Sequence, residues 1–169
     1  ERPEKLRDRA IMLVLLDTGL RAQELCNLRA KHFDGQTGKL IVMHGKGDKH
    51  RIIYMGESAR KALAHLAARG SLQPDDVILA ARDGKPLDRT GLRKMIMRCA
   101  QRGGVERATV HRFRHTFAIN FLRNGGSVLE LQHMLGHARL DTIRIYATLA
   151  ESDLREAQKR ASPADKWNL

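Results

Sequence analysis

Apolar residues recur at the three-to-four-residue spacing of helices over most of the chain. Residues 4–17 follow this period and Gly19 ends the predicted helix; its apolar positions are Leu6, Ala10, Leu13, Val14 and Leu16. A shorter helix is expected over residues 21–28, with Leu25 and Leu28 facing inward. The same pattern predicts helices over residues 58–69, 89–102, 110–122, 128–135 and 151–159, and another, capped by Asp141, that contains Tyr146.

The period changes after residue 32 from helical spacing to that of short strands. Residues 33–38 are typical of a strand end and a turn, and residues 40–43 and 51–55 are typical of strands. Gly45–Lys49 between them is a glycine-flanked hairpin tip. We therefore predict a mainly α-helical fold with a small antiparallel β-sheet, an α+β protein. The 169 residues contain no internal repeat and are expected to form one domain, 1–169.

Turn-forming residues separate the predicted helices. Asp88 is a candidate N-cap, and glycines at positions 103–104, 125–126 and 136 end three helices. The helix over residues 110–122 carries one apolar stripe, made of Val110, Phe113, Phe117 and Phe121. We interpret this stripe as core rather than as a platform for stacking nucleic-acid bases.

Composition favours a basic, helical protein that binds a polyanion. Aromatic residues make up only 4% of the chain, so the core is expected to consist of Leu, Ile, Val, Ala and Met. Lys and Arg total 31 against 19 Asp and Glu, a formal net charge of +12. Such a charge attracts nucleic acid, and the planar fork of arginine binds phosphate oxygens in pairs. We therefore favour DNA or RNA over a membrane surface as the partner.

The sequence also bears on location. The longest apolar stretch, Ile11–Leu16, is far shorter than the roughly 20 residues of a membrane span, and no signal-peptide pattern opens the chain. Cys26 and Cys99 are far apart in sequence and are expected to be reduced core residues of a cytoplasmic protein. The chain starts at Glu1 rather than Met, so we expect it to be part of something longer.

Four segments place polar residues inside otherwise apolar helices or at a hairpin tip. They are Thr18–Leu25, Gly45–Gly47, His111–Phe117, and Leu135–His137 with Tyr146 nine positions later. Each segment alone is a weak signal, since His-x-x-Arg and Gly-Lys-Gly are short and common. Their order and separation together form a specific combination.

In this combination the chain resembles the catalytic domain of tyrosine recombinases of the phage integrase family, with Xer-like motifs. The resemblance runs from about Leu6 to Leu149. It implies a mainly helical fold with a small sheet that bears Lys46. The family's conserved site residues fall on Arg21, Lys46, His111, Arg114, His137 and Tyr146, with Glu24 as a supporting acidic residue.

Chemistry gives a reason for each of these residue types. A phenol has a pKa of about 10, so Tyr146 as nucleophile needs help to lose its proton, and the resemblance places His111 as that base or its assistant. Arg21 and Arg114 suit the negative charge that grows on the non-bridging phosphate oxygens. The best general acid for the departing 5′ oxygen is Lys46. The remaining two residues have lesser roles: His137 hydrogen-bonds the phosphate, and Glu24 orients its arginine or a neighbouring histidine.

Each residue also has a simpler interpretation when taken alone. Arg21 and Glu24 suit a surface ion pair, Lys46 a solvated turn, and His137 a helix cap. His115 rivals His111 equally. The chain has a second tyrosine, Tyr54, but its apolar strand pattern favours packing over attack. We prefer the joint interpretation because six independent coincidences would otherwise be needed.

The resemblance implies DNA cleavage and rejoining through a 3′-phosphotyrosyl intermediate and exchange of strands through a four-way junction. We expect double-stranded DNA and a homotetramer on that DNA as partners, with no membrane and no small-molecule substrate. No carboxylate cluster, His-Glu-x-x-His motif or phosphate loop is present in the sequence, so we expect neither a metal nor a nucleotide cofactor. The alternatives are a non-catalytic DNA-binding relative and a type IB topoisomerase.

Two further expectations concern the ends of the chain. Family members usually carry an N-terminal DNA-binding domain, which nothing in this chain matches. We therefore expect the chain alone to bind DNA weakly and with strong salt dependence. The tail around Trp167 has two equal interpretations, docking onto a neighbouring subunit or packing on its own domain.

Overall fold

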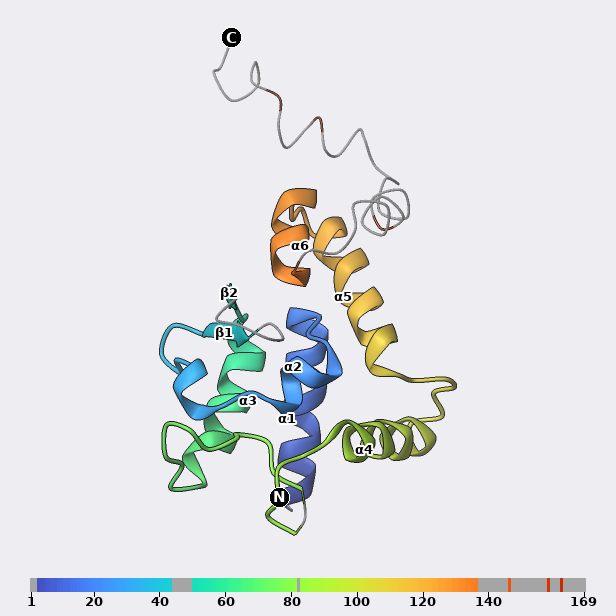
Figure 1. The fold of residues 1–169 in the computed structure, drawn as a ribbon. Helices are drawn as coiled ribbons and strands as arrows, with labels where there is room; N and C mark the ends of the chain where they lie inside the picture. Colours follow the sequence, from blue (N-terminus) through green and yellow to red (C-terminus); the bar gives the residue numbers. More distant parts are fainter. Residues whose placement is uncertain are drawn as a thin grey trace. The chain divides into compact units, whose positions relative to one another are not determined.

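The computed structural model describes residues 3–43, 50–81 and 83–136, together with Tyr146, Gln158 and Ser162 (Figure 1). Two compact units divide the chain, Glu1–Phe117 and Ala118–Leu169. The described elements are α1 (Pro3–Thr18), α2 (Ala22–Cys26), a 3-10 turn η1 (Ala30–His32), β1 (Lys39–Met43), β2 (His50–Tyr54), α3 (Glu57–Ala68), α4 (Arg89–Arg102), α5 (Val110–Arg123) and α6 (Val128–Leu135). The predicted fold class, mainly α with a small antiparallel sheet, is confirmed. That residues 1–169 form one domain stays a prediction.

The core of the first unit is built around α1, which packs against α3. Ala10, Ile11, Val14 and Leu15 are fully buried, as one stripe of a helix requires. The predicted face of this helix was partly wrong, since Leu16 is 43% exposed. Period alone does not choose between adjacent stripes of an apolar helix. Packing against α3 determines which stripe of α1 is buried.

The two strands form an antiparallel hairpin whose register is closely defined. Leu40 pairs with Ile53, Val42 with Arg51, and Met43 with His50. The turn before β1 is held by Asp34, whose carboxylate accepts from the Gln36 backbone N–H at 2.8 Å and from the Thr37 hydroxyl at 2.6 Å. This confirms the predicted turn over residues 33–38. The predicted hairpin tip, Gly45–Lys49, lies outside the described residues.

A side chain of α1 anchors the end of the hairpin. The Asp17 carboxylate accepts a hydrogen bond from the Gly56 backbone N–H at 2.6 Å, at the residue that caps α3. An acceptor with negative charge stabilises a helix N-terminus, where the backbone N–H groups lack helical partners. The end of β2, the start of α3 and the end of α1 are therefore joined at one place.

The predicted N-cap at Asp88 and the helix end at Gly136 are confirmed, and the structure adds a cap at Ser127 that was not predicted. Asp88 Oδ1 accepts from the Gly91 backbone N–H at 2.7 Å at the start of α4. Ser127 and Glu130 form a reciprocal capping box at the start of α6, and Gly136, with a φ of 66°, follows its end. The helix predicted over residues 151–159 and the cap at Asp141 lie outside the described residues, except that Gln158 is helical.

Both cysteines are free thiols, as expected, although only Cys26 is fully buried. Burial and the nearby Asp88 carboxylate raise the pKa of the Cys26 thiol to about 11, which makes it a poor nucleophile. Among the described helices, none combines the length and apolar character that a membrane crossing demands.

Candidate active site

Arg21 is presented by a tight turn between α1 and α2. Gly19 adopts a φ of 60° just after α1, a conformation that glycine reaches without a steric penalty. The Thr18 hydroxyl donates to the Val14 carbonyl oxygen at 2.6 Å, and Leu20 is fully buried. The turn is therefore fixed from inside, and it leaves Arg21 as the N-cap residue of α2 with a side chain 45% exposed.

Glu24 lies one turn into α2 and holds Arg21 by two hydrogen bonds. Its Oε1 accepts from Arg21 Nη1 at 3.0 Å, and its Oε2 accepts from the Arg21 backbone N–H at 2.9 Å. The Glu24 side chain is only 7% exposed. The sequence suggested a surface ion pair between Arg21 and Glu24. In the structure Arg21 is partly exposed, but Glu24 is buried.

A third charged residue, Arg51, completes this cluster and was missed from the sequence. Arg51 Nη1 donates to Glu24 Oε1 at 2.9 Å and Nη2 donates to Oε2 at 3.0 Å, a two-pronged ion pair. Burial alone would raise the pKa of Glu24. The hydrogen bonds from Arg51 and the Arg21 backbone, with the positive charges of both arginines, instead lower it to about 2. Glu24 is therefore a permanent anion between two cations.

Arg114 reaches the same turn from α5. Its side chain is buried, 8% exposed, and its Nη1 donates to the Gly19 carbonyl oxygen at 2.8 Å. Gly19 lies only two residues before Arg21. The structure thus brings the ends of α1 and α2 together with the arginine of the His-x-x-Arg segment, although 95 positions separate Gly19 from Arg114.

The two histidines that competed in the sequence form one pair. His111 Nε2 and His115 Nε2 are 2.7 Å apart, with the rings edge to face at 4.3 Å between centroids. Burial and the neighbouring charges of His111 and Arg114 lower the pKa of His115. One ring nitrogen must donate and the other accept, so the contact requires at least one neutral ring.

Three further predicted site residues fall in the second unit or outside the described residues. Tyr146 is helical and belongs to the second unit, and its side chain is 2% exposed. Lys46 and His137 lie outside the described residues. The structure therefore gathers Arg21, Glu24 and Arg114 around one turn.

The interpretation of Tyr54 as a packing residue was wrong. Tyr54 ends β2 and is 61% exposed, because its strand alternates with Arg51 and Ile53 inward. An apolar run of strand residues does not reveal which alternate positions face the core. The inward positions of β2 are instead occupied by Arg51 and Ile53.

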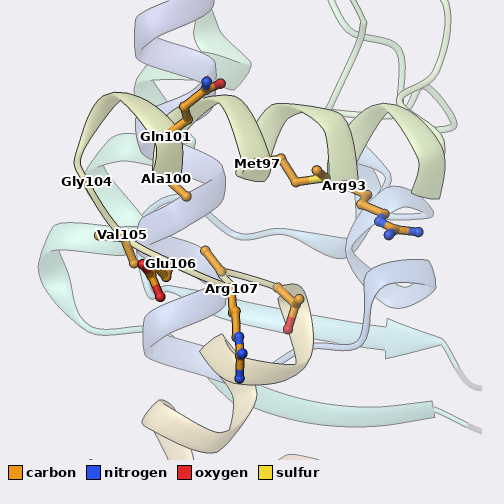
Figure 2. A pocket seen from close by; sticks show the side chains of 10 residues that line it. Arg93, Met97, Ala100, Gln101, Gly104, Val105, Glu106 and Arg107 are labelled. Carbon is orange, nitrogen blue, oxygen red and sulfur yellow. The ribbon is translucent and has the colours of Figure 1, made fainter.

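A hollow of about 690 Å³ lies between α4 and the connection to α5. Figure 2 shows Arg93, Met97 and Gln101 entering from α4, while Val105 and Arg107 come from the connection. Of the predicted site residues, the described ones are all absent from its lining. The candidate site is a cluster of charged residues in which the side chains of Arg114, Arg51 and Glu24 are buried and that of Arg21 is partly exposed.

Comparison with known proteins shows the family to which the chain belongs. A family model described as the phage integrase family matches residues 1–153, so the chain belongs to that family. It is 34% identical to tyrosine recombinase XerA of Thermococcus kodakarensis over 97% of this chain and 58% of that protein. Tyrosine recombinase XerC of Yersinia pestis is 36% identical, over 97% of this chain and 55% of that protein.

Solved structures give the same result for the fold. A crystal structure of XerA recombinase superposes with a TM-score of 0.76 and 37% identity, covering 94% of this chain and 57% of that one. XerH recombinase bound to difH substrate, a pre-cleavage complex, gives 0.73 and 27% identity, covering 87% and 44%. The fold is that of a tyrosine recombinase catalytic domain. The chain spans a little over half the length of the curated relatives it matches.

Proposed function

We propose that this chain is the catalytic domain of a site-specific DNA recombinase that cuts and rejoins double-stranded DNA through a 3′-phosphotyrosyl intermediate. Family membership supports this, as do the XerH structures described as pre-cleavage and post-cleavage complexes with difH. The observation that carries it is the hydrogen bond from Arg114 to Gly19, which brings a second arginine to the turn of Arg21. Two guanidinium groups at one turn suit a single phosphate.

In the proposed reaction the phenol oxygen of Tyr146 attacks the scissile phosphorus. The bond from phosphorus to the 5′ oxygen breaks, and Lys46 protonates that oxygen. His111 takes the phenol proton or assists its transfer. Arg21 and Arg114 stabilise the charge on the non-bridging oxygens. One phosphoester bond replaces another, so rejoining is the reverse step and requires no ATP.

Two other residues have supporting roles in this proposal. His137 donates a hydrogen bond to the phosphate, and Glu24 holds Arg21 in place. Because Tyr146 is 2% exposed, the proposed attack requires a rearrangement that brings its phenol to the DNA.

The positive charge of α4 supports DNA as the partner, in addition to membership of the family. The exposed side of α4 carries five cations and its sequence contains no Asp or Glu; the cations are Arg89, Arg93, Lys94, Arg98 and Arg102. Unopposed cations along one helix attract the phosphate backbone. We also propose a tetramer on DNA, since exchange of two strand pairs needs four nucleophiles. Sedimentation of the protein with its junction substrate would test that stoichiometry.

The test of the proposed chemistry is capture of a covalent adduct. A pool of nicked duplexes with randomised sequence is incubated with the protein, and the DNA that remains attached through denaturation is sequenced. The enriched duplex then serves as substrate for Tyr146→Phe, which should form no adduct. Tyr54→Phe is the matched control and should react normally, because Tyr54 is the other tyrosine of the chain. An adduct that persists in Tyr146→Phe would refute the assignment.

A further inference from the structure

Arg51 is buried, and burial of a charged side chain costs desolvation free energy. It points inward from β2, paired with Val42, and its side chain is 7% exposed. Burying a guanidinium removes its hydration, and a buried pair often adds little net stability compared with apolar packing. The position would therefore suit an aliphatic residue such as Ile53, which faces inward two positions later.

The contacts of Arg51 with Glu24 indicate a functional role for this buried arginine. The two terminal nitrogens of Arg51 are used on the two oxygens of Glu24, at 2.9 and 3.0 Å. The same oxygens receive the side chain and the backbone N–H of Arg21, at 3.0 and 2.9 Å. Glu24 therefore binds the buried Arg51 on one side and the partly exposed Arg21 on the other.

We infer that Arg51 is a positioning residue for the DNA-cleavage reaction: by fixing both oxygens of Glu24, it sets the orientation in which Arg21 meets the scissile phosphate. This inference rests on the proposed function of Arg21. Within the described part of the chain, the Arg51 side chain contacts Glu24, through which it acts on Arg21. A carboxylate that loses the two hydrogen bonds from Arg51 is held less firmly in one rotamer, and Arg21, which it binds, is then held less firmly too.

The hairpin gives Arg51 a second connection. The pairs Val42 with Arg51 and Met43 with His50 are the last pairs of the sheet before residues 44–49. Lys46, the proposed general acid, lies in that segment of the sequence. The Arg51–Glu24 ion pair therefore ties the base of the hairpin to the helix whose first residue follows Arg21.

The geometry also explains the choice of arginine over lysine. The planar fork of arginine donates two parallel hydrogen bonds and so fixes a carboxylate in one plane. A lysine ammonium supplies the same charge from a single point. Arg51→Lys should therefore keep much of the stability and lose much of the orientation, whereas Arg51→Met should lose both.

The first measurement needs no DNA. Nitrogen relaxation of the Arg21 Nε–H group is compared between the wild type, Arg51→Lys and Arg51→Met by NMR. The order of the Arg21 side chain should fall in Arg51→Lys and fall further in Arg51→Met. Arg60→Met is the matched control, because Arg60 is a partly buried arginine that binds the carbonyl oxygens of Gly35 and Gln36 instead of Glu24. It should leave the order of Arg21 unchanged.

The second measurement is single-turnover cleavage of the captured duplex at saturating DNA. Arg51→Met should slow cleavage roughly ten- to a hundredfold, with little change in the DNA concentration at half saturation. In an Arg21→Ala background the same substitution should have no further effect on the rate, because the group it positions is gone. Arg51→Lys, the variant that keeps the charge, should give an intermediate rate.

Two results would overturn the inference. One is an Arg21 side chain that is equally ordered with and without Arg51. The other is rate losses that multiply in the Arg21→Ala, Arg51→Met double variant, as a purely structural role of Arg51 would produce. Failure of the wild type to form any adduct would instead refute the proposed function. The NMR comparison would still decide whether Arg51 holds Arg21.

Discussion

Glu24 offers the sharpest test of the charged cluster, because a single atom exchange removes its charge. Glu24→Gln keeps the shape of the side chain but puts an amide where two arginines now donate four hydrogen bonds. Arg51, 7% exposed, would lose the carboxylate that its two terminal nitrogens bind. Removing one partner of a buried ion pair is costly because the remaining charge stays out of water.

The size of the effect follows from the pKa. Its fall from 4.5 to about 2 means that the ionised form is bound more favourably in the folded protein. At 1.36 kcal/mol for each pKa unit, this corresponds to about 3 kcal/mol of stability at neutral pH. We expect Glu24→Gln to lower the free energy of unfolding by about that amount, in urea titrations followed by circular dichroism at pH 7.

The dependence on pH has a definite sign. A carboxyl whose pKa is lower in the folded state contributes stability above its unfolded value of 4.5, and this contribution is lost as the pH falls towards about 2. The wild type should therefore exceed Glu24→Gln by a constant margin from pH 7 to pH 5. The margin should shrink below pH 4.5. A loss under about 1 kcal/mol at pH 7, or a margin that does not change with pH, would refute the reasoning.

Three further predictions concern other parts of the chain. Nitration by tetranitromethane, mapped by mass spectrometry, should modify Tyr54 (61% exposed) well before Tyr146 (2% exposed); equal rates would contradict the burial of Tyr146. Burial, and secondly the neighbouring positive charge, lower the pKa of His115, so its ring should titrate below 6.5 by NMR. Its neutral form should then stabilise the fold above pH 6.5. A titration at or above 6.5 would contradict this. Gly38→Ala should cost about 1–3 kcal/mol in thermal unfolding, since Gly38 has a φ of 75° and the new Cβ would lie 2.9 Å from the Met55 carbonyl oxygen; an unchanged melting temperature would refute the strain.

Most elements of the fold could be predicted from the sequence because their signals are local. The helix cap at Asp88 depends on a residue three positions away, and the glycines that end helices act through their own backbone. The hairpin was recognisable because a glycine-flanked turn separates two short apolar runs. These features need no knowledge of distant contacts.

The candidate site was predictable only as a set of residue types. Arg21, Glu24 and Arg114 were selected because their motifs, in this order, resemble those of tyrosine recombinases, and the structure brings the three residues to one turn. Arg51 was overlooked because it follows a lysine-rich hairpin tip and looks like one more surface cation. The sequence did contain a signal for its burial: Arg51 lies two positions before Ile53, so both residues are on the same face of the strand.

The sequence by itself determined which segments are helices, where the hairpin turns, and which polar side chains are available for chemistry. Only the tertiary structure decided that Arg51 faces inward to Glu24, that Tyr54 faces outward, and that the guanidinium of Arg114 meets Gly19. The physical reason is that local propensities act over a few residues, whereas the buried face of a strand is set by what packs against it. The partner of a buried charge can lie anywhere in the chain, and only folding brings the two together.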